Sequence, residues 1–402
     1  MKLYVKNVRV IDGISPKPLE NRHVVINGTM IETVSDKPIE DFDGTVWDGT
    51  GKTLLPGLVD SHVHLSGNGL PDVLERFTDP EAVVTLRAAA NARKTLEAGI
   101  TMVRNVGEKA YIDVHLARSI EAKETIGPRV ITCGRGISIL GGHGTPVIRE
   151  VCGADDARLA VREHIKAGVD QIKVIASGGV LSKGTYVGAH QMTMDELRAI
   201  TDEARTHFRR TCAHAHGAQA IRNCIEAGIN TIEHCSLPDE ESMELMAQKG
   251  IYMIPTFASS EMILRYGKEA GIRDEVIEKS KRVDEEHKER FRQAIAKGVK
   301  VAMGTDASTP YNFNGENAME LALMVDAGMT PMDAIIASTR NGAIVCEREH
   351  VTGTIEAGKF ADLLVVEGDP LTHISLLQNK TNFHLIMKEG EVVFARDRQL
   401  QE

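Results

Sequence analysis

The feature that most constrains the fold is a repeated pattern in which a helical stretch ends at a glycine and a short β-rich run follows at once. The copies are L-E-A-G-I-T-M-V-R-N-V around Gly99, I-K-A-G-V-D-Q-I-K-V-I around Gly168, I-E-A-G-I-N-T-I-E-H-C around Gly228, M-A-Q-K-G-I-Y-M-I-P-T at Gly250 and A-I-A-K-G-V-K-V-A-M-G-T-D at Gly298. Glycine readily adopts the left-handed conformation that ends a helix, so each copy predicts a helix leading into a strand.

Three further β-rich runs, at residues 58–64, 130–133 and 210–214, bring the candidate strands to eight, mostly separated by helical patterns. Strands that alternate with helices form a parallel sheet, and eight such units predict a distorted (β/α)8 TIM barrel. The glycines are irregularly spaced, which excludes a solenoid of fixed period.

The two chain ends show a different pattern, of short alternating strands with glycine-containing turns, as in H-V-V-I-N-G-T-M-I and L-I-M-K-E-G-E-V-V-F. We expect these ends to pair as one small β-sandwich. The predicted fold class is therefore α/β, with a hydrolase barrel over residues 57–351 and a β-sandwich domain built from residues 1–56 and 352–402. Two segments interrupt the barrel pattern. Residues 262–297 are predicted to form a charged, solvated helix, and the glycine-rich residues 134–144 are predicted to form an active-site loop.

Composition limits the possible partners. The chain is 42% hydrophobic and 26% charged, as globular proteins are, and its net charge of -10 without a basic cluster argues against nucleic acid or an anionic membrane as a partner. The first residues alternate like a strand, and no uncharged run reaches the roughly 18–20 residues needed to span a bilayer, so we expect a cytoplasmic protein. The cysteines stand singly and are expected to be mostly buried free thiols: Cys133, Cys152, Cys212, Cys224, Cys235 and Cys346.

The first candidate site residues are His62 and His64 in L-P-G-L-V-D-S-H-V-H. Residues two apart in a strand face the same side, and barrel enzymes place their sites at the carboxyl ends of their strands. An H-x-H pair alone is a weak metal signal, because such pairs also occur on ordinary polar faces.

Later strands add ligand-type residues at their ends. His214 closes the run T-C-A-H, His234 closes T-I-E-H and Asp306 closes V-A-M-G-T-D, while Lys173 interrupts the apolar run Q-I-K-V-I-A. A buried ammonium without a partner costs several kcal/mol or loses its proton. The residues therefore predict a metal site with an unusual lysine.

This ordered set resembles the amidohydrolase superfamily, specifically its binuclear members with a carboxylated lysine. The opening motif and the closing G-T-I-E-A-G-K-F-A-D-L-L-V-V-E-G-D-P extend the resemblance over nearly the whole chain. Further motifs, I-K-V-I-A-S-G-G-V-L-S, G-G-H-G and A-H-A-H-G, are similar to those of metal-dependent dipeptidases that cleave Xaa-Pro or Xaa-Arg and Xaa-Lys substrates. That family often forms homo-oligomers, which we expect here too.

The resemblance implies two divalent ions, expected to be zinc, and a role for each ligand. His62 and His64 hold the more buried ion with Asp306, while His214 and His234 hold the more exposed one. Lys173, as a carbon dioxide-derived N6-carboxylysine, bridges both. A hydroxide shared by the ions attacks the amide, and Asp306 transfers its proton to the leaving amine. Either His214 or His216 can be the strand-five ligand; His214 is preferred because it directly follows the apolar run.

Other members of the superfamily, the one-metal deaminases and imidazolone hydrolases, carry a glutamate three residues after the strand-five histidine. Here that position is Gly217, or Gln219 if His216 is the ligand. Lys173 would also have no role in a one-metal site, and both the missing acid and this lysine favour two metals. The remaining alternatives are a cyclic amidohydrolase of hydantoinase or lactamase type and an inactive, metal-stabilised barrel that only binds ligands.

We therefore expect a small-molecule or dipeptide substrate with a free carboxylate, or an N-acyl amino acid. Five side chains with hydrogen-bond donors could hold this carboxylate. They are His143, Tyr186, His216, Arg135 and His190.

Overall fold

The computed structural model describes residues 2–72, 78–144, 147–397 and 400. Its internal contacts divide the chain into two compact units. Unit 1 comprises Met1–Asp60, Arg93–Met102 and Gly315–Glu402, and unit 2 comprises Ser61–Ala92 and Val103–Asn314. The domain boundaries expected after residues 56 and 351 stay a prediction.

Unit 1 is built on one sheet to which both chain ends contribute. Its strands are β1 (Lys2–Val10), β2 (Leu19–Asn27), β3 (Met30–Ser35), β4 (Thr45–Asp48), β5 (Lys52–Pro56), β16 (Leu363–Glu367), β17 (Phe383–Lys388) and β18 (Glu391–Ala395). The order is β18-β17-β16-β5-β1-β2-β3, with β4 on β1. The two ends meet where β5 and β16 pair antiparallel, from Leu363 opposite Pro56 to Glu367 opposite Lys52. This sandwich-like sheet confirms the predicted pairing of the ends.

The barrel strands form two sheets. One has the order β6 (Leu58–Val63), β7 (Ile100–Asn105), β8 (Arg129–Thr132). The other is entirely parallel, with the order β10 (Ile148–Val151), β9 (Gly136–Ile139), β11 (Ile172–Ile175), β12 (Thr211–Gly217), β13 (Thr231–Leu237), β14 (Tyr252–Ile254), β15 (Lys300–Val301). All eight expected strands are present, and β9 and β10 are additions.

Isolated backbone hydrogen bonds connect these two sheets at both edges, in place of a continuous ladder. On one side, Thr132 O accepts from the amides of Asp170 and Gln171 at 2.9 and 3.0 Å. On the other, Asp306 N donates to His62 O at 2.8 Å, beside a parallel bridge between Val63 and Ala307. The α/β barrel architecture is thus confirmed as a distorted one.

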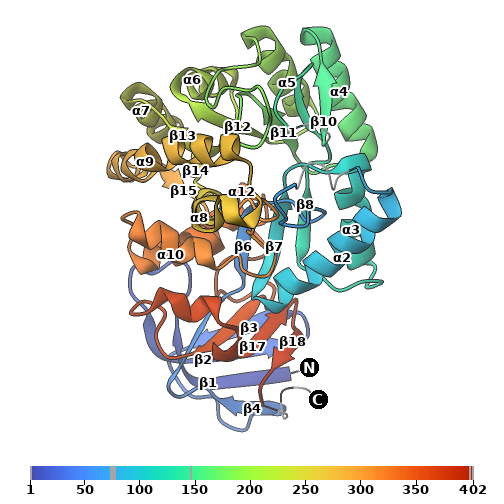
Figure 1. Cartoon of the computed structure of the whole chain (residues 1–402). Helices are drawn as coiled ribbons and strands as arrows, with labels where there is room; N and C mark the ends of the chain where they lie inside the picture. The colour runs from blue at the N-terminus through green and yellow to red at the C-terminus, as the bar shows by residue number, and fades with distance from the viewer. Residues whose placement is uncertain (1, 73–77, 145–146, 398–399, 401–402) are drawn as a thin grey trace. The chain divides into compact units, whose positions relative to one another are not determined.

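Helices follow the strands of unit 2 as the repeat predicts, and Figure 1 shows α4 to α7 lying outside the strands that they connect. They are α2 (Glu81–Glu97), which continues into unit 1, α3 (Ile112–Glu121), α4 (Ala154–Ala167), α5 (Met194–Thr206), α6 (Ala218–Ala227), α7 (Glu240–Lys249), α8 (Phe257–Tyr266) and α9 (Asp274–Ala296). All five repeat glycines have a positive φ, from 67° to 92°, as the helix-ending role requires. Unit 1 carries α10 (Met319–Asp326), α11 (Pro331–Ile336) and α12 (Gly342–Val345).

Two predictions about the segments that interrupt the repeat are wrong in part. Residues 134–144 are not all loop, because Gly136–Ile139 pair as β9 with β10 and touch β11. Within residues 262–297, Asp274–Ala296 form the charged helix α9 and the first residues belong to α8, but the buried face of α9 includes Ser280 and His287. Both of these residues line the cavity of the candidate metal centre.

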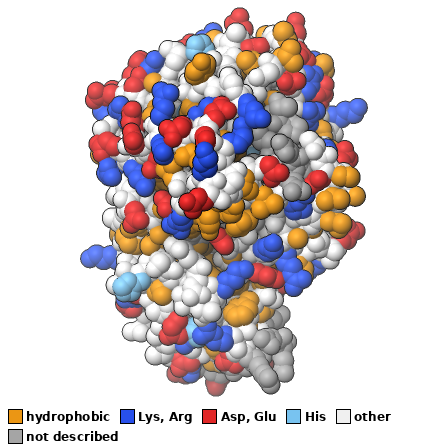
Figure 2. Space-filling model, viewed as in Figure 1, with side chains coloured by type: hydrophobic (Ala, Val, Ile, Leu, Met, Phe, Trp, Pro, Cys, Tyr) orange, Lys and Arg blue, Asp and Glu red, His pale blue; other side chains and the backbone are white. Residues whose placement is uncertain are grey.

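Charges of both signs are interspersed over the face seen in Figure 2. Within the described ranges, no helix combines the length and the apolar character needed to cross a membrane.

Candidate metal centre

One cavity of about 110 Å³ in unit 2 contains every expected metal ligand. These residues are His62, His64, Lys173, His214, His234 and Asp306. They come from β6, β11, β12, β13 and the segment after β15, or directly follow those elements. Parallel strands bring residues far apart in the chain to one end of the barrel, where such sites are built.

His62, His64 and Asp306 form the first group of potential ligands. The Nδ1 atoms of the two histidines face acceptors, Glu233 Oε2 at 2.7 Å and Gly107 O at 3.1 Å, so each Nδ1 carries a proton. The two Nε2 atoms then present lone pairs to Asp306 Oδ1, at 3.5 and 3.2 Å. A lone pair repels a carboxylate oxygen unless a proton or a metal ion lies between them, so this donor set fits a cation.

Asp306 remains ionised despite its burial. Burial raises the pKa of its carboxyl, but positive charge at the Nε2 atoms of His62 and His64, from a proton or a metal ion, outweighs that effect and holds the pKa well below its usual value. The backbone φ of Asp306 is 58°, a left-handed conformation that is costly for a residue with a side chain. Such strain is typical of functional positions.

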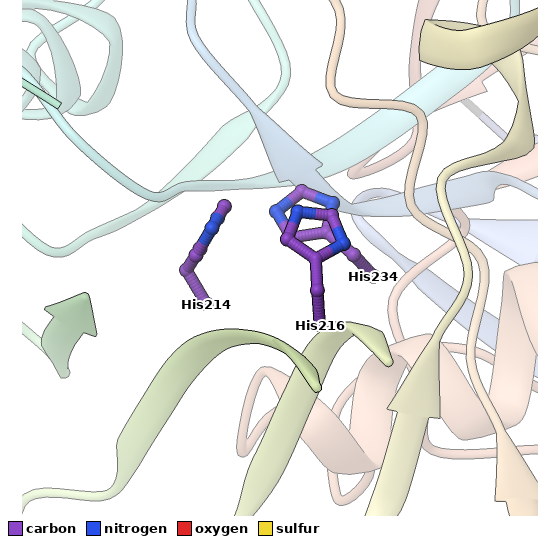
Figure 3. A group of neighbouring side chains, drawn as sticks. All are labelled: His214, His216 and His234. Carbon is purple, nitrogen blue, oxygen red and sulfur yellow. The ribbon is translucent and has the colours of Figure 1, made fainter. Parts of the chain in front are cut away.

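His214, His216 and His234 form the second group, shown in Figure 3. The rings of His216 and His234 are stacked at 4.9 Å, and His214 lies 4.5 Å from His234 with its ring nearly perpendicular. Burial lowers the pKa of all three, to about 3 for His216, so the rings are neutral and offer lone pairs. Neutral imidazoles are the usual zinc ligands.

Hydrogen bonds orient two of these rings, whereas the third has an open position. His234 Nδ1 pairs with Thr256 Oγ1 at 2.7 Å, and His216 Nδ1 pairs with Ser236 Oγ at 3.0 Å. His214 Nε2 is buried and has no hydrogen-bond partner in the described part of the chain. A buried nitrogen of this kind needs a ligand, and a metal ion would satisfy it.

The expected strand ends are wrong at three positions. β12 continues to Gly217, so His216 lies in the strand as His214 does, and both are 5% exposed. β13 continues to Leu237, with a register shift against β12 that accompanies the left-handed φ of 65° at His234. β15 is only two residues long and ends before Asp306. His214 therefore does not end its strand, and its position in β12 does not favour it over His216.

Lys173 lies in the middle of β11 and is 2% exposed. Its ammonium has no hydrogen bond or ion pair among the residues that the structure describes. An ammonium that is buried without a direct hydrogen bond or ion pair is costly, and conversion to a carbamate between two cations would remove that cost. Both expected metals and the modified lysine thus fit the residues present.

The structure also identifies a supporting network that the sequence reasoning missed. Arg104, fully buried, donates from Nη2 to Glu233 Oε1 at 2.9 Å and from Nε to Ser61 O at 2.7 Å. Glu233 in turn orients His62. Burial raises the pKa of Glu233, but Arg104 and the hydrogen bond from His62 lower it to about 2. Arg104 and Glu233 could have been found in the sequence, because both are charged residues within apolar strands, as Lys173 is.

The expected carboxylate-binding residues divide into two sets. His143 and His216 line the cavity, and His143 Nδ1 pairs with Ser182 Oγ at 2.7 Å. The structure does not bring the other three to the cavity. Arg135 donates to the carbonyl of Ile148, Tyr186 is 80% exposed, and His190 is exposed beside its backbone bridge to Ser177.

Gly217, which stands where one-metal members of the superfamily carry a glutamate, has no room for a side chain. A Cβ atom at Gly217 would lie 2.3 Å from Gly188 O and 2.9 Å from Gly188 Cα. The backbone of the loop after β11 therefore occupies the space that an acidic side chain would need, which agrees with the two-metal interpretation.

The fold and the site together define a metal-dependent hydrolase of the barrel type, and comparison with known proteins gives the family. The Amidohydrolase family profile matches residues 53–393, so the chain belongs to the amidohydrolase family and is a hydrolytic enzyme. It is 31% identical to ochratoxinase from Aspergillus niger over 412 residues, covering 94% of this chain and 83% of that protein.

Two crystal structures are also similar. One is a Xaa-Pro dipeptidase with methionine bound in its active site, with 31% identity, a TM-score of 0.91 and coverage of 98% and 99% of the two chains. The other is a prolidase complexed with N-methylphosphonate-L-proline, with 29% identity, a TM-score of 0.91 and coverage of 98% and 100%. The expected resemblance to the superfamily and its prolidase-like branch is confirmed.

Proposed function

We propose that this chain is a binuclear zinc enzyme that hydrolyses the amide bond of small dipeptides, Xaa-Pro in the first place, and of N-acyl amino acids. The observation that carries the proposal is the presence of two three-residue ligand groups in one cavity, together with a buried lysine that makes no hydrogen bond or ion pair in the described part of the chain. The prolidase among the similar structures supports the same substrate class.

His62, His64 and Asp306 would hold one ion, and His214 and His234 the other. The open, buried Nε2 of His214 supports His214 as the ligand from β12. Lys173 would bridge the ions after its neutral amine adds to carbon dioxide and loses one proton. Zinc suits this set of imidazole and carboxylate ligands.

When bound, the ions would polarise the scissile carbonyl and lower the pKa of a water molecule. Asp306 is the carboxylate in the cavity placed to accept the proton of that water and to deliver it to the leaving nitrogen. Amide and water thereby give a carboxylic acid and an amine. His143 and His216, both neutral and cavity-lining, can donate hydrogen bonds to the substrate carboxylate.

The charges of the cavity favour an uncharged side chain over arginine or lysine in the substrate. Among the described residues that line it, only Lys173 and Asp306 carry an ammonium or a carboxylate, and both are assigned to the metals. A cationic substrate side chain would find no free carboxylate there, and burying it unpaired costs several kcal/mol. Proline avoids this cost.

The test is a zinc-loaded sample assayed against Xaa-Pro, Xaa-Arg and N-acyl amino acid panels, beside hydantoin and dihydroorotate. We expect cleavage of Xaa-Pro substrates and two zinc ions per chain by elemental analysis. Asp306→Asn should lower kcat by several orders of magnitude. Ring opening without amide cleavage would establish a cyclic amidohydrolase instead, and a chain that binds no zinc and cleaves nothing would establish a binding-only barrel.

A further inference from the structure

Helix α9 presents two polar side chains to the cavity that the proposed reaction leaves unused. Ser280 and His287 line the cavity and are 0% and 2% exposed. Neither Ser280 Oγ nor His287 Nδ1 has a hydrogen-bond partner in the described ranges. A buried polar group without a hydrogen bond is costly to the fold, so both atoms are open positions for a ligand.

The orientation of His287 fixes what it can bind. Its Nε2 lies 3.0 Å from His234 O, and because a carbonyl oxygen only accepts, Nε2 carries the proton of the neutral ring. Nδ1 then offers a lone pair to the cavity. The ring of Phe257 packs against the imidazole at 4.5 Å between centroids. His287 is therefore a fixed acceptor, next to the backbone of a proposed metal ligand.

Ser280 stands beside an apolar wall. One helical turn before it, Val276 packs in a cluster with Ile263 and Ile272, and Val180 and Leu181 pack against this cluster. Three of these side chains also line the cavity: Val180, Leu181 and Ile263. An apolar group lying on this wall would reach the hydroxyl of Ser280 at its end.

The spacing of the two residues sets the size of the ligand. They are seven positions apart on one helix, or roughly 10 Å along its axis, so they contact two different points of a bound molecule. A tyrosine residue likewise has two separated polar groups, because its amino nitrogen and its phenol oxygen lie several ångströms apart. His287, close to His234, suits the amino end near the reacting carbonyl.

We propose that Ser280 and His287 form a specificity subsite for the amino-terminal residue of the substrate, built for an apolar side chain that ends in a hydroxyl, as in tyrosine. His287 Nδ1 accepts a hydrogen bond from the amino N–H, and Ser280 Oγ pairs with the hydroxyl of the side chain. The inference rests on the proposed dipeptidase function.

Tyr-Pro and Phe-Pro test the subsite because they differ by one hydroxyl. With the zinc-loaded enzyme we expect kcat/KM to be about tenfold higher for Tyr-Pro, since pairing one buried hydroxyl recovers roughly 1–3 kcal/mol. Ser280→Ala should reduce this ratio to about one by weakening the reaction of Tyr-Pro alone. The variant removes an unsatisfied group, so it should fold at least as well as the native chain.

His287→Gln isolates the second contact. Its amide nitrogen can still donate to His234 O, whereas the acceptor at Nδ1 is lost. We expect kcat/KM to fall about tenfold for both dipeptides, with an unchanged ratio and unchanged zinc content. Ser259→Ala is the matched control: this serine lines the same cavity from α8 but is half-buried, so water can satisfy it, and the ratio should not change.

A native ratio near one, or a ratio that survives Ser280→Ala, would overturn the proposal. If no dipeptide is cleaved at all, the proposed function fails but the subsite is still testable by calorimetry on the zinc-loaded chain. L-tyrosine should then bind about tenfold more tightly than L-phenylalanine, and Ser280→Ala should abolish the difference. Equal binding of the two amino acids would refute the subsite.

Discussion

Replacing Glu233 by glutamine tests whether the buried network under the metal site holds His62 in place. The carboxylate accepts from three donors: Arg104 Nη2 at 2.9 Å, Thr231 Oγ1 at 2.6 Å and His62 Nδ1 at 2.7 Å. A glutamine has only one oxygen, so its amide nitrogen must face one of these donors. The change also removes the charge of Glu233 from the ion pair with the fully buried Arg104.

The expected cost follows from the same contacts. The pKa of Glu233, lowered from 4.5 to about 2, corresponds to about 3 kcal/mol in favour of the charged form in the folded state. Breaking one partner of a buried ion pair typically costs about 3–5 kcal/mol. We therefore expect Glu233→Gln to lower the free energy of unfolding by about 3 kcal/mol. A misplaced His62 should also weaken metal binding by about 10–100-fold.

Denaturant unfolding of the metal-free chain measures the first effect, and competition with a chelator measures the second. Glu226→Gln is the control, because its pair with Arg198 at 2.7 Å is exposed and worth at most about 1 kcal/mol. The folded pKa is lowered, so the stabilisation is complete above the unfolded value of about 4.5 and disappears as the pH falls towards 2. The difference between native and variant chains should shrink over that range. A loss below about 1 kcal/mol with unchanged metal affinity would refute the positioning role.

Three further predictions concern single positions. Lys173→Ala should reduce zinc occupancy and activity, and short carboxylic acids that stand in for the carbamate should restore part of the activity; full zinc occupancy in the variant would contradict a bridging role. Gly217→Ala should destabilise the chain by about 1–3 kcal/mol in thermal unfolding, because the new Cβ would lie 2.3 Å from Gly188 O, and a neutral effect would show that the loop yields freely. A thiol reagent should label one cysteine in the native chain and six in denaturant, because Cys152 is exposed and the other five are buried; labelling of several native thiols would contradict this burial.

The barrel could be predicted from the sequence because its signals are local. A glycine that ends a helix depends on its own backbone conformation, and all five repeat glycines have the expected positive φ. Strand lengths could not be predicted, because a strand ends where its pairing with a neighbour ends. β12 and β13 remain paired as far as Gly217 and Leu237 only because each has the other beside it.

The candidate metal ligands could be found in the sequence because each is a polar residue within or directly after an apolar run, a pattern that needs a special explanation. The same pattern holds for Arg104 and Glu233, which could have been found in this way. Loop positions carry no such information: nothing near Tyr186 in sequence reveals that its side chain extends into solvent. His287 is hidden for another reason, since a histidine among the many charges of α9 resembles part of a solvated face.

The distribution of unsatisfied groups separates support from function within unit 2. Arg104 and Glu233, both fully buried, are hydrogen-bonded to each other and to neighbouring protein atoms. Three cavity atoms have none in the described part of the chain: His214 Nε2, Ser280 Oγ and His287 Nδ1. At about 1–3 kcal/mol each, they would together cost a large part of the 5–15 kcal/mol by which a folded chain is typically stable. Buried atoms outside the cavity, such as Ser138 Oγ, also lack a partner in the described ranges, so an unsatisfied atom indicates a ligand position only where it lines the cavity beside other ligand-type groups, as these three atoms do.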